Sequence, residues 1–291
     1  MTDSRNARRR ASGRTIVKSV TYIDWTDSDA AAFIAVPTAE DDKYSRGVLG
    51  VVTGSPDYPG AAVLGVEAAL RTGVGMVRYL GPGRATRLVL QRRPEVVTVP
   101  GRVQAWLLGS GMDAATRDAG TSLRLADALA QALPTVIDAG ALDLLEAASG
   151  QVVITPHLGE LARLLDVEKG EIAANPAHWA ATAADELRIT VLLKGASTHV
   201  ADSHGSRLVV RSSTAWTATA GTGDALGGIL GALIATHSTE IATDPRVLAR
   251  LAATASVLHR LAAERASGGG PFTALDLAGE VSAVVAGLVA R

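Results

Sequence analysis

At 291 residues the chain is long enough to bury a large core, and a single α/β domain of this size is ordinary. Its 28 lysines and arginines nearly balance 29 aspartates and glutamates, so the net charge of −1 gives no overall field that favours nucleic acid or an acidic membrane. The chain has no cysteine, which excludes disulfides, thiol catalysis and cysteine-ligated metals and suits a reducing cytoplasm. No apolar run approaches the ~20 residues of a membrane span.

The N-terminal stretch differs in composition from the rest of the chain. Residues 1–14 are polar and include three consecutive arginines at 8–10. Because this stretch has no apolar core, it is not expected to be a secretory signal. We expect residues 1–20 to form a disordered basic tail and residues 21–291 to form a single domain.

Short β-branched runs then alternate with longer alanine-rich helical patterns. The continuous apolar runs, typical of strands buried on both faces, are residues 48–52, 76–80, 106–108, 135–137, 152–154 and 190–193. The helical patterns are residues 61–72, 123–133, 159–165, 176–187, 245–266 and 275–289. This alternation predicts an α/β sandwich of three layers, with a mostly parallel central sheet flanked by helices on both faces.

Polar and glycine-rich segments follow five of these strands. They are residues 53–62, 109–113, 138–141, 155–160 and 194–198. Ligands of open parallel sheets bind beyond the carboxyl ends of the strands, so these segments are expected to meet at one edge of the sheet. Each segment alone is ordinary loop chemistry, but together they predict a binding site.

Residues 218–235 carry the most informative stretch, in which a turn of small residues at 220–223 leads through Asp224 into an apolar helix. Glycines let the backbone approach a ligand closely, and a helix start offers free N–H groups and the positive end of the helix dipole. Phosphate is the usual occupant of such a site. A carboxylate there is placed to take a proton or hold a metal ion. The alternative is an N-capped core helix in which the dipole favours Asp224.

Other polar side chains follow the predicted strands. Lys194 precedes small residues with accessible backbone and is expected to meet a nucleotide phosphate, although solvent is the commonest environment of a lysine. His157 can hydrogen-bond a polar substrate, while Thr155 and Glu160 are expected to support the start of the next helix. Asp138 either stabilises its own turn or reaches the shared site.

A metal site built from histidines is not expected, because the six histidines show no ligand-like spacing. Any divalent ion is expected to be Mg²⁺, bound through phosphates and a carboxylate. Glu160, acting through a water molecule, is the candidate among the side chains.

With these motifs in place, the chain resembles the ribokinase-like superfamily, and closely its ADP-dependent NAD(P)H-hydrate dehydratase branch. The matching segments occur in the family's order at residues 43–47, 54–55, 58–62, 93–95, 109–111, 138–142, 155–160, 194–198 and 221–224. The Gly-Thr-Gly-Asp segment alone indicates only the superfamily. The Pro-His-Leu-Gly-Glu turn and the Tyr-Pro-Gly-Ala-Ala loop indicate the branch, and the likeness spans residues 21–289.

The resemblance implies a repair reaction on NADH or NADPH that has gained water across the nicotinamide ring. In such enzymes ADP phosphorylates the ring hydroxyl of the S epimer and phosphate then leaves, giving AMP, inorganic phosphate and NAD(P)H. Hydroxide is a poor leaving group and phosphate a good one. The site therefore needs a base for the hydroxyl proton and positive groups for the transferring phosphoryl.

The resemblance also assigns roles to particular residues. Asp224 is implied as the base and Gly221, Thr222 and Gly223 as the anion hole. The implied nucleotide-binding residues are Lys194, Gly195, Ala196, Ser197, Thr198 and Gly223. The implied hydrated-nicotinamide site consists of Ala62, Gly111, His157 and Asp224, with Asp138 as a further candidate. ADP is the implied co-substrate, Mg²⁺ the cofactor, and a homo-oligomer (a tetramer, as in relatives) the assembly, with neither nucleic acid nor membrane as a partner.

The chain departs from the family pattern at two loops. The family's Gly-Pro-Gly-Leu-Gly reads Gly-Ser-Gly-Met-Asp at residues 109–113, which changes one wall of the expected site. The common Asn-Pro-Gly stretch is replaced at residues 214–217, and Ala220 stands where glycine is frequent. Trp216 could stack on a base, fill the core or form an interface. Some family members carry an attached epimerase domain; residues before 21 are too few for one, so we expect the dehydratase alone.

Two other functions fit the same residues. A small-molecule kinase of this fold, acting on a hydroxymethylpyrimidine, a thiazole alcohol or a sugar, would share Asp224 and the anion hole. A nucleotide-binding protein without turnover is suggested by the altered loop at 109–113. The alanine-rich stretch at 252–263 suits packing between subunits, although a helix buried within one chain has the same pattern.

Overall fold

The computed structural model describes residues 20–290, and a nine-stranded sheet with the order β1-β9-β8-β7-β6-β5-β4-β2-β3 forms its middle layer. The strands are β1 (Ile23–Asp24), β2 (Val48–Val52), β3 (Met76–Tyr79), β4 (Ala105–Leu108), β5 (Thr135–Ile137), β6 (Val152–Ile154), β7 (Thr190–Leu193), β8 (Ser197–Ala201) and β9 (Arg207–Arg211). Neighbouring strands are parallel except in the pairs β7–β8 and β8–β9. The predicted mostly parallel sheet is confirmed.

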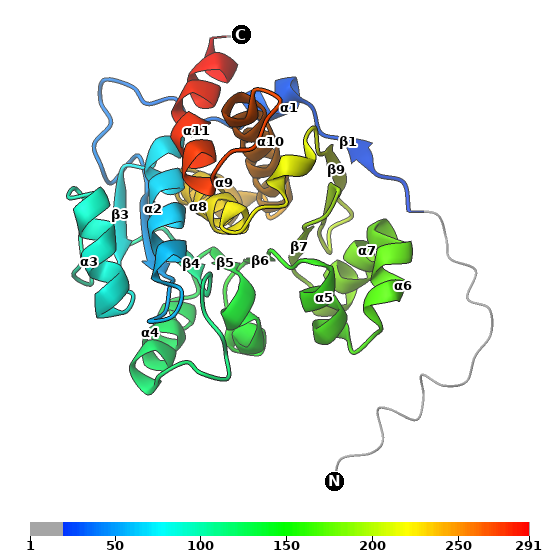
Figure 1. Ribbon diagram of the computed structural model, residues 1–291, viewed down its shortest axis with the longest axis horizontal. Helices are drawn as coiled ribbons and strands as arrows, with labels where there is room; N and C mark the ends of the chain where they lie inside the picture. The colour runs from blue at the N-terminus through cyan, green and yellow to red at the C-terminus, as the bar shows by residue number, and fades with distance from the viewer. Residues whose placement is uncertain (1–19, 291) are drawn as a thin grey trace.

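Helices cover both faces of this sheet (Figure 1). They are α1 (Asp27–Ala31), α2 (Pro59–Thr72), α3 (Gly83–Arg92), α4 (Ala119–Leu129), α5 (Leu158–Leu165), α6 (Lys169–Ala174), α7 (Pro176–Leu187), α8 (Thr222–Thr236), α9 (Ser238–Thr243), α10 (Val247–Ser267) and α11 (Ala274–Val289), with 3-10 turns η2 (Ala139–Ala147) and η3 (Ala215–Thr217). Helices α2, α8, α10 and α11 lie on one face, and α4, α5, α6 and α7 on the other (Figure 1). The predicted three layers are therefore present.

Each strand contributes side chains to two separate hydrophobic cores. In β2, Leu49 and Val51 belong to the core under α8 and α10, whereas Val48 and Val52 belong to the core on the opposite face. Successive side chains of a strand point to opposite faces, so a strand covered on both sides is apolar at every position. This is why the strands could be recognised as continuous apolar runs.

The predicted strands 48–52, 135–137, 152–154 and 190–193 have the observed bounds. The helix predicted at 123–133 was misplaced. Helix α4 begins four residues earlier because the Asp118 carboxylate caps it, accepting a hydrogen bond from the Thr121 N–H. Helix α3 and strands β8 and β9 were missed, and Ser197 and Thr198 lie in β8 rather than in a loop. Strand β8 mixes polar and apolar residues and has no continuous apolar run.

Helix α8 lies at the centre of one helix layer, packed directly on α2. A Cβ added to Gly228 would lie 2.0 Å from the Gly65 carbonyl oxygen, so the two backbones touch where both helices have glycine. This contact fixes the start of α8, and with it Asp224, against the edge of the sheet.

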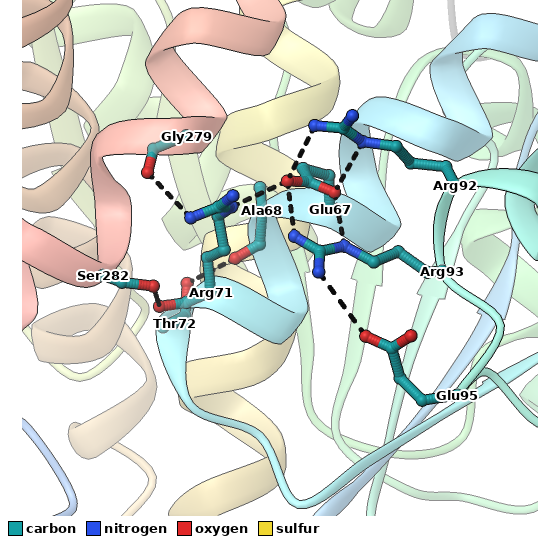
Figure 2. A network of polar contacts seen from close by, with 9 residues as sticks. All are labelled: Glu67, Ala68, Arg71, Thr72, Arg92, Arg93, Glu95, Gly279 and Ser282. Atoms are coloured by element: carbon teal, nitrogen blue, oxygen red, sulfur yellow. Dashed lines mark hydrogen bonds and ion pairs between the residues drawn. The ribbon is translucent and has the colours of Figure 1, made fainter.

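A buried carboxylate joins α2 to α3 and α11 (Figure 2). Glu67 on α2 is fully buried and receives the guanidinium groups of Arg71, Arg92 and Arg93, with the closest contact 2.5 Å from Arg93 Nε. Arg71 also donates to the Gly279 carbonyl of α11 over 3.0 Å. Burial by itself would raise the pKa of Glu67, but the arginine hydrogen bonds outweigh it and lower the pKa to about 2.

The structure also bears on two other predictions, the packing of the alanine-rich stretch and the absence of a membrane span. The alanines of α10 that suggested subunit packing, Ala252, Ala253, Ala255, Ala262 and Ala263, are fully buried within the chain itself. Within residues 20–290, no helix is long and apolar enough to cross a membrane. Residues 1–19 of the predicted basic tail lie outside the described part of the chain.

Candidate active site

The loop before α8 and the first turn of the helix form the centre of the site. Gly221, the N-cap, has φ +92°, a left-handed conformation that glycine adopts without strain. The Thr222 hydroxyl donates to the carbonyls of Thr217 and Thr219, both at 2.9 Å, and holds the loop closed. The first N–H groups of an α-helix have no partner within the helix, so this turn can bind an anion as the sequence predicted.

Asp224 is the third residue of α8 and is half-buried. Within residues 20–290 its carboxylate makes no ion pair at contact distance. Burial, and to a smaller extent the charge of Asp138, raise the pKa of Asp224 to about 7, although the Lys194 charge acts in the opposite direction. A carboxylate with this pKa can accept a proton near neutral pH, which a general base must do.

Asp138 lies at the centre of a buried polar network. It is 2% exposed, and its Oδ1 faces Lys194 Nζ at 3.0 Å and the Thr155 hydroxyl at 2.7 Å. Its Oδ2 accepts a hydrogen bond from the Ser110 hydroxyl at 2.9 Å. Burial opposes ionisation, but the Lys194 charge and these hydrogen bonds hold the pKa of Asp138 below its usual value. Ser110 stands where the family has proline, so the altered loop adds a donor that proline lacks.

Lys194 extends from the end of β7 toward the start of α8. Its Nζ lies 3.5 Å from the position that a Cβ on Gly223 would occupy. Burial works against the charged form, but Asp138, Glu160 and Asp224 together keep the pKa of Lys194 above its usual value. The ammonium is therefore charged and next to the predicted anion hole.

His157 and Glu160 form the capping box of α5. His157 Nδ1 accepts hydrogen bonds from the Gly159 and Glu160 N–H groups at 3.0 and 3.1 Å, and Glu160 Oε2 accepts from the His157 N–H at 2.8 Å. Its other ring nitrogen, Nε2, lies 3.5 Å from Glu160 Oε1, and the His157 side chain is 54% exposed, so the ring is still accessible to a ligand. The helix-capping role of His157 and its predicted hydrogen bond to a substrate are thus compatible.

Ala62 and Gly111 come together around Gly54. A Cβ on Gly54 would lie 3.1 Å from the Ala62 Cβ, and a Cβ on Gly111 would lie 3.4 Å from the Gly54 Cα. Gly111 has φ +65°. In the same altered loop, Asp113 is exposed and accepts a hydrogen bond from the Ala115 N–H.

A first cavity of about 680 Å³ opens beside Lys194 and the start of α8. Of the predicted nucleotide-binding residues, its lining includes Lys194, Gly195, Ala196, Thr198 and Gly223. Ser197 is not part of the lining. The volume is within the range of about 300–1,000 Å³ that small-molecule sites have.

The lining also contains residues to which the sequence assigned no role in the site, among them Arg211, His259 and Arg260. His259 Nε2 lies 2.9 Å from the Thr222 carbonyl, so this nitrogen carries the proton. Burial lowers the pKa of His259 to about 4, and the ring is neutral at pH 7. Trp216 is 48% exposed on η3, beside lining residues Ala215 and Thr217, which excludes the core-filling role.

Among residues 20–290, no three histidine or acidic side chains are close enough together to hold a metal ion. Mg²⁺ needs fewer protein ligands, because it is commonly held by one or two carboxylates together with substrate phosphates and water. Asp224 and Glu160, both acting on Lys194, are the carboxylates near the first cavity that fit such an ion.

A mostly parallel sheet between two helix layers, with a glycine-rich helix start beside a nucleotide-sized cavity, defines a ribokinase-like α/β protein. A protein-family model described as NAD(P)H-hydrate dehydratase matches residues 49–277. The chain therefore belongs to the NAD(P)H-hydrate dehydratase family.

Relatives agree with this assignment. The chain is 43% identical over 220 residues to the bifunctional NAD(P)H-hydrate repair enzyme Nnr of Mycobacterium tuberculosis, covering 72% of this chain and 45% of that protein. It thus spans about half the length of the curated relatives it matches first. It is 33% identical over 218 residues to the ADP-dependent (S)-NAD(P)H-hydrate dehydratase of Xanthomonas campestris, covering 67% of this chain and 74% of the relative.

Solved structures support the fold. The ADP/ATP-dependent NAD(P)H-hydrate dehydratase from Bacillus subtilis, co-crystallised with ATP/Mg²⁺, superposes with a TM-score of 0.81 at 24% identity. The match covers 93% of this chain and all of that one.

Proposed function

We propose that this protein uses ADP to dehydrate the S epimers of hydrated NADH and NADPH, returning the working cofactors. The observation that carries the proposal is Asp224, whose pKa of about 7 and position beside Lys194 suit a base at a phosphoryl-transfer site. Family membership supports the choice of substrate.

ADP occupies the first cavity in this proposal. Lys194 meets its phosphates as a point charge, and Gly195, Ala196 and Thr198 contact the nucleotide from the β7–β8 turn and the start of β8. The β-phosphate lies at the start of α8, over Gly221, Thr222 and Gly223. Arg211 and Arg260 also line this cavity, each paired with acidic side chains: Arg211 with Asp24, and Arg260 with Asp27 and Glu264.

The hydrated nicotinamide lies among Ala62, Gly111, His157 and Asp224. Asp224 takes the proton of the ring hydroxyl while that oxygen attacks the β-phosphorus of ADP. The new O–P bond forms as the bond from the β-phosphorus to the bridging oxygen breaks, and AMP leaves. Asp138, whose oxygens are all engaged, holds Lys194 in place rather than contacting the ring.

The phosphorylated ring then loses phosphate from one carbon and a proton from the neighbouring carbon, which forms the ring double bond of NAD(P)H. The ring nitrogen supplies the electron pair that helps phosphate leave. The overall balance is NAD(P)H hydrate plus ADP giving NAD(P)H, AMP and inorganic phosphate.

We include Mg²⁺ in the proposal as an ion that arrives with the nucleotide, with Glu160, through water, as its protein contact, since Asp224 serves as the base. Bound there, it would neutralise charge on the transferring phosphoryl. Support comes from the Bacillus subtilis neighbour, co-crystallised with ATP/Mg²⁺, and from the relative described as ADP-dependent.

The proposal also covers organisation. We infer that residues 21–291 form a single domain, since β1 pairs with β9 and α11 packs on α2, so the first and last elements of the described residues 20–290 join the same fold. We expect a cytoplasmic homo-oligomer, a tetramer by family likeness, whose other partners are small molecules.

The test is recovery of the reduced-nicotinamide absorbance from hydrated NADH, with ADP and Mg²⁺ present or omitted. We expect absorbance to return only with the nucleotide, with AMP and phosphate released in equal amounts. A product that keeps the phosphate would identify a kinase instead. Nucleotide binding without either product would identify a binding protein.

A further inference from the structure

A second cavity, of about 570 Å³, lies at the same edge of the sheet on the side of His157 and Gly111. Its lining includes Met112, next to Gly111, and Glu160, in the first turn after His157. The Glu160 charge also acts on Lys194, which lines the first cavity. The residues expected to hold the nicotinamide therefore lie between two cavities of similar size.

The acidic side chains that line the second cavity already have partners. Asp143 receives both terminal nitrogens of Arg117, at 3.0 and 2.7 Å. Glu160 accepts from the His157 N–H at 2.8 Å, and Asp113 accepts from a backbone N–H at 2.9 Å. Of the three, Asp143 is paired with a guanidinium group, and the other two carboxylates are held by backbone N–H groups.

Arg163, one turn after Glu160 on α5, differs from these acidic side chains in charge and in its lack of a partner among residues 20–290. It lines the cavity and is exposed, and the structure records no side-chain hydrogen bond or ion pair between it and any other residue of 20–290. A guanidinium presents several donors in a plane and matches phosphate oxygens in pairs. Tyr58, also in the lining, is 63% exposed and offers an aromatic ring to a base.

We propose that the second cavity binds the adenosine half of the hydrated dinucleotide, with Arg163 contacting one of its phosphates. This inference rests on the proposed function. While ADP fills the first cavity and the nicotinamide lies at Asp224, the rest of the substrate needs a separate site. The second cavity adjoins the nicotinamide residues and has a free cation.

The test compares Arg163→Ala with wild type on hydrated NADH and hydrated NADPH. The matched control is Arg87→Ala, which removes an exposed arginine from α3 at the other end of the sheet (Figure 1). Loss of a charge-assisted hydrogen bond should lower kcat/KM about tenfold while the KM for ADP stays unchanged. Loss with hydrated NADPH alone assigns Arg163 to the 2′-phosphate, and equal loss with both assigns it to the pyrophosphate. Values within twofold of Arg87→Ala for both substrates overturn the inference.

A binding experiment separates this inference from the proposed function. With AMP saturating the first cavity, calorimetry measures binding of NADP⁺ and NAD⁺ to wild type and to both variants. Weaker binding by Arg163→Ala supports the second cavity even if wild type shows no dehydratase turnover. Equal binding by wild type and Arg163→Ala overturns the cavity assignment even if turnover is normal.

Discussion

Asp138 shows how a buried carboxylate influences its neighbours at the site. Its carboxylate is held by Ser110, Thr155 and Lys194, and it stays charged although it is buried. That charge raises the pKa of Asp224 and anchors the ammonium that opposes it. Burial is the larger cause of the raised pKa of Asp224, and the Asp138 charge adds to it, so Asp224 can take a proton near neutral pH.

We predict that Asp138→Asn moves the acid limb of the kcat/KM profile to lower pH. In wild type the rate should rise with pH through about 7, where Asp224 loses its proton. Without the Asp138 charge the pKa of Asp224 falls, so the limb shifts toward acid. Ser110→Ala is the control, because it removes one hydrogen bond but leaves the charge. An unchanged limb in Asp138→Asn would show that the carboxylates are not coupled.

Residue contacts of this kind were only partly predictable. The turn and Asp224 are contiguous, so their chemistry could be recognised in one stretch. Ser110 meets Asp138 across 28 residues and His259 meets Thr222 across 37, and no local pattern indicates either contact. From the family resemblance, Ser110 could be described only as the loss of a proline. Its hydrogen bond to Asp138 could not be predicted, because the carboxylate lies in a distant part of the sequence.

At the scale of elements, the packing of α8 on α2 decides where Asp224 lies. The helices touch through Gly65 and Gly228, and Gly221 starts α8 with a left-handed turn. The apolar stretch predicted α8 but not its partner. Strand β8 was missed because its first three residues are polar and only partly buried, so it lacks the continuous apolar run of a strand covered on both faces.

Gly228→Ala should therefore be severely destabilising. Its Cβ would lie 2.0 Å from a backbone oxygen of α2, which cannot move without shifting the helix. We expect a loss of about 3 kcal/mol in the free energy of unfolding, at the upper end for overpacking, measured by urea denaturation. Gly287→Ala on α11 is the control, since nothing lies within 4 Å of its added Cβ. It should be neutral or stabilising, by up to about 1 kcal/mol. Equal stability of the two variants would contradict the packing argument.

At the scale of the whole molecule, Glu67 connects helices from distant parts of the chain. Its partners come from α2, from α3 and from the residue after α3, and Arg71 reaches α11 (Figure 2). Burying a carboxylate with several arginines costs desolvation free energy. The contribution of the network to stability is therefore seen mainly as the destabilisation that follows when one partner is removed.

Glu67→Gln should lower the free energy of unfolding at pH 7 by about 3 kcal/mol, because three guanidinium groups lose a buried counter-charge. The folded pKa of about 2 lies below the ordinary value of 4.5, so the network stabilises fully above pH 4.5 and weakens as the pH falls toward 2. Urea unfolding across this range should show the wild-type advantage shrinking with acid. Glu95→Gln, half-exposed and 3.6 Å from Arg93, should change stability by less than about 1 kcal/mol. A wild-type advantage independent of pH would contradict the network.

The most direct measurement is turnover of hydrated NADH by Asp224→Asn beside wild type, with ADP affinity measured on both by calorimetry. An amide cannot take the hydroxyl proton, so we predict a rate loss of about 10²- to 10⁴-fold. ADP affinity and the urea unfolding curve should stay close to wild type. A variant that keeps its rate within a few fold would contradict the assignment of Asp224 as the base.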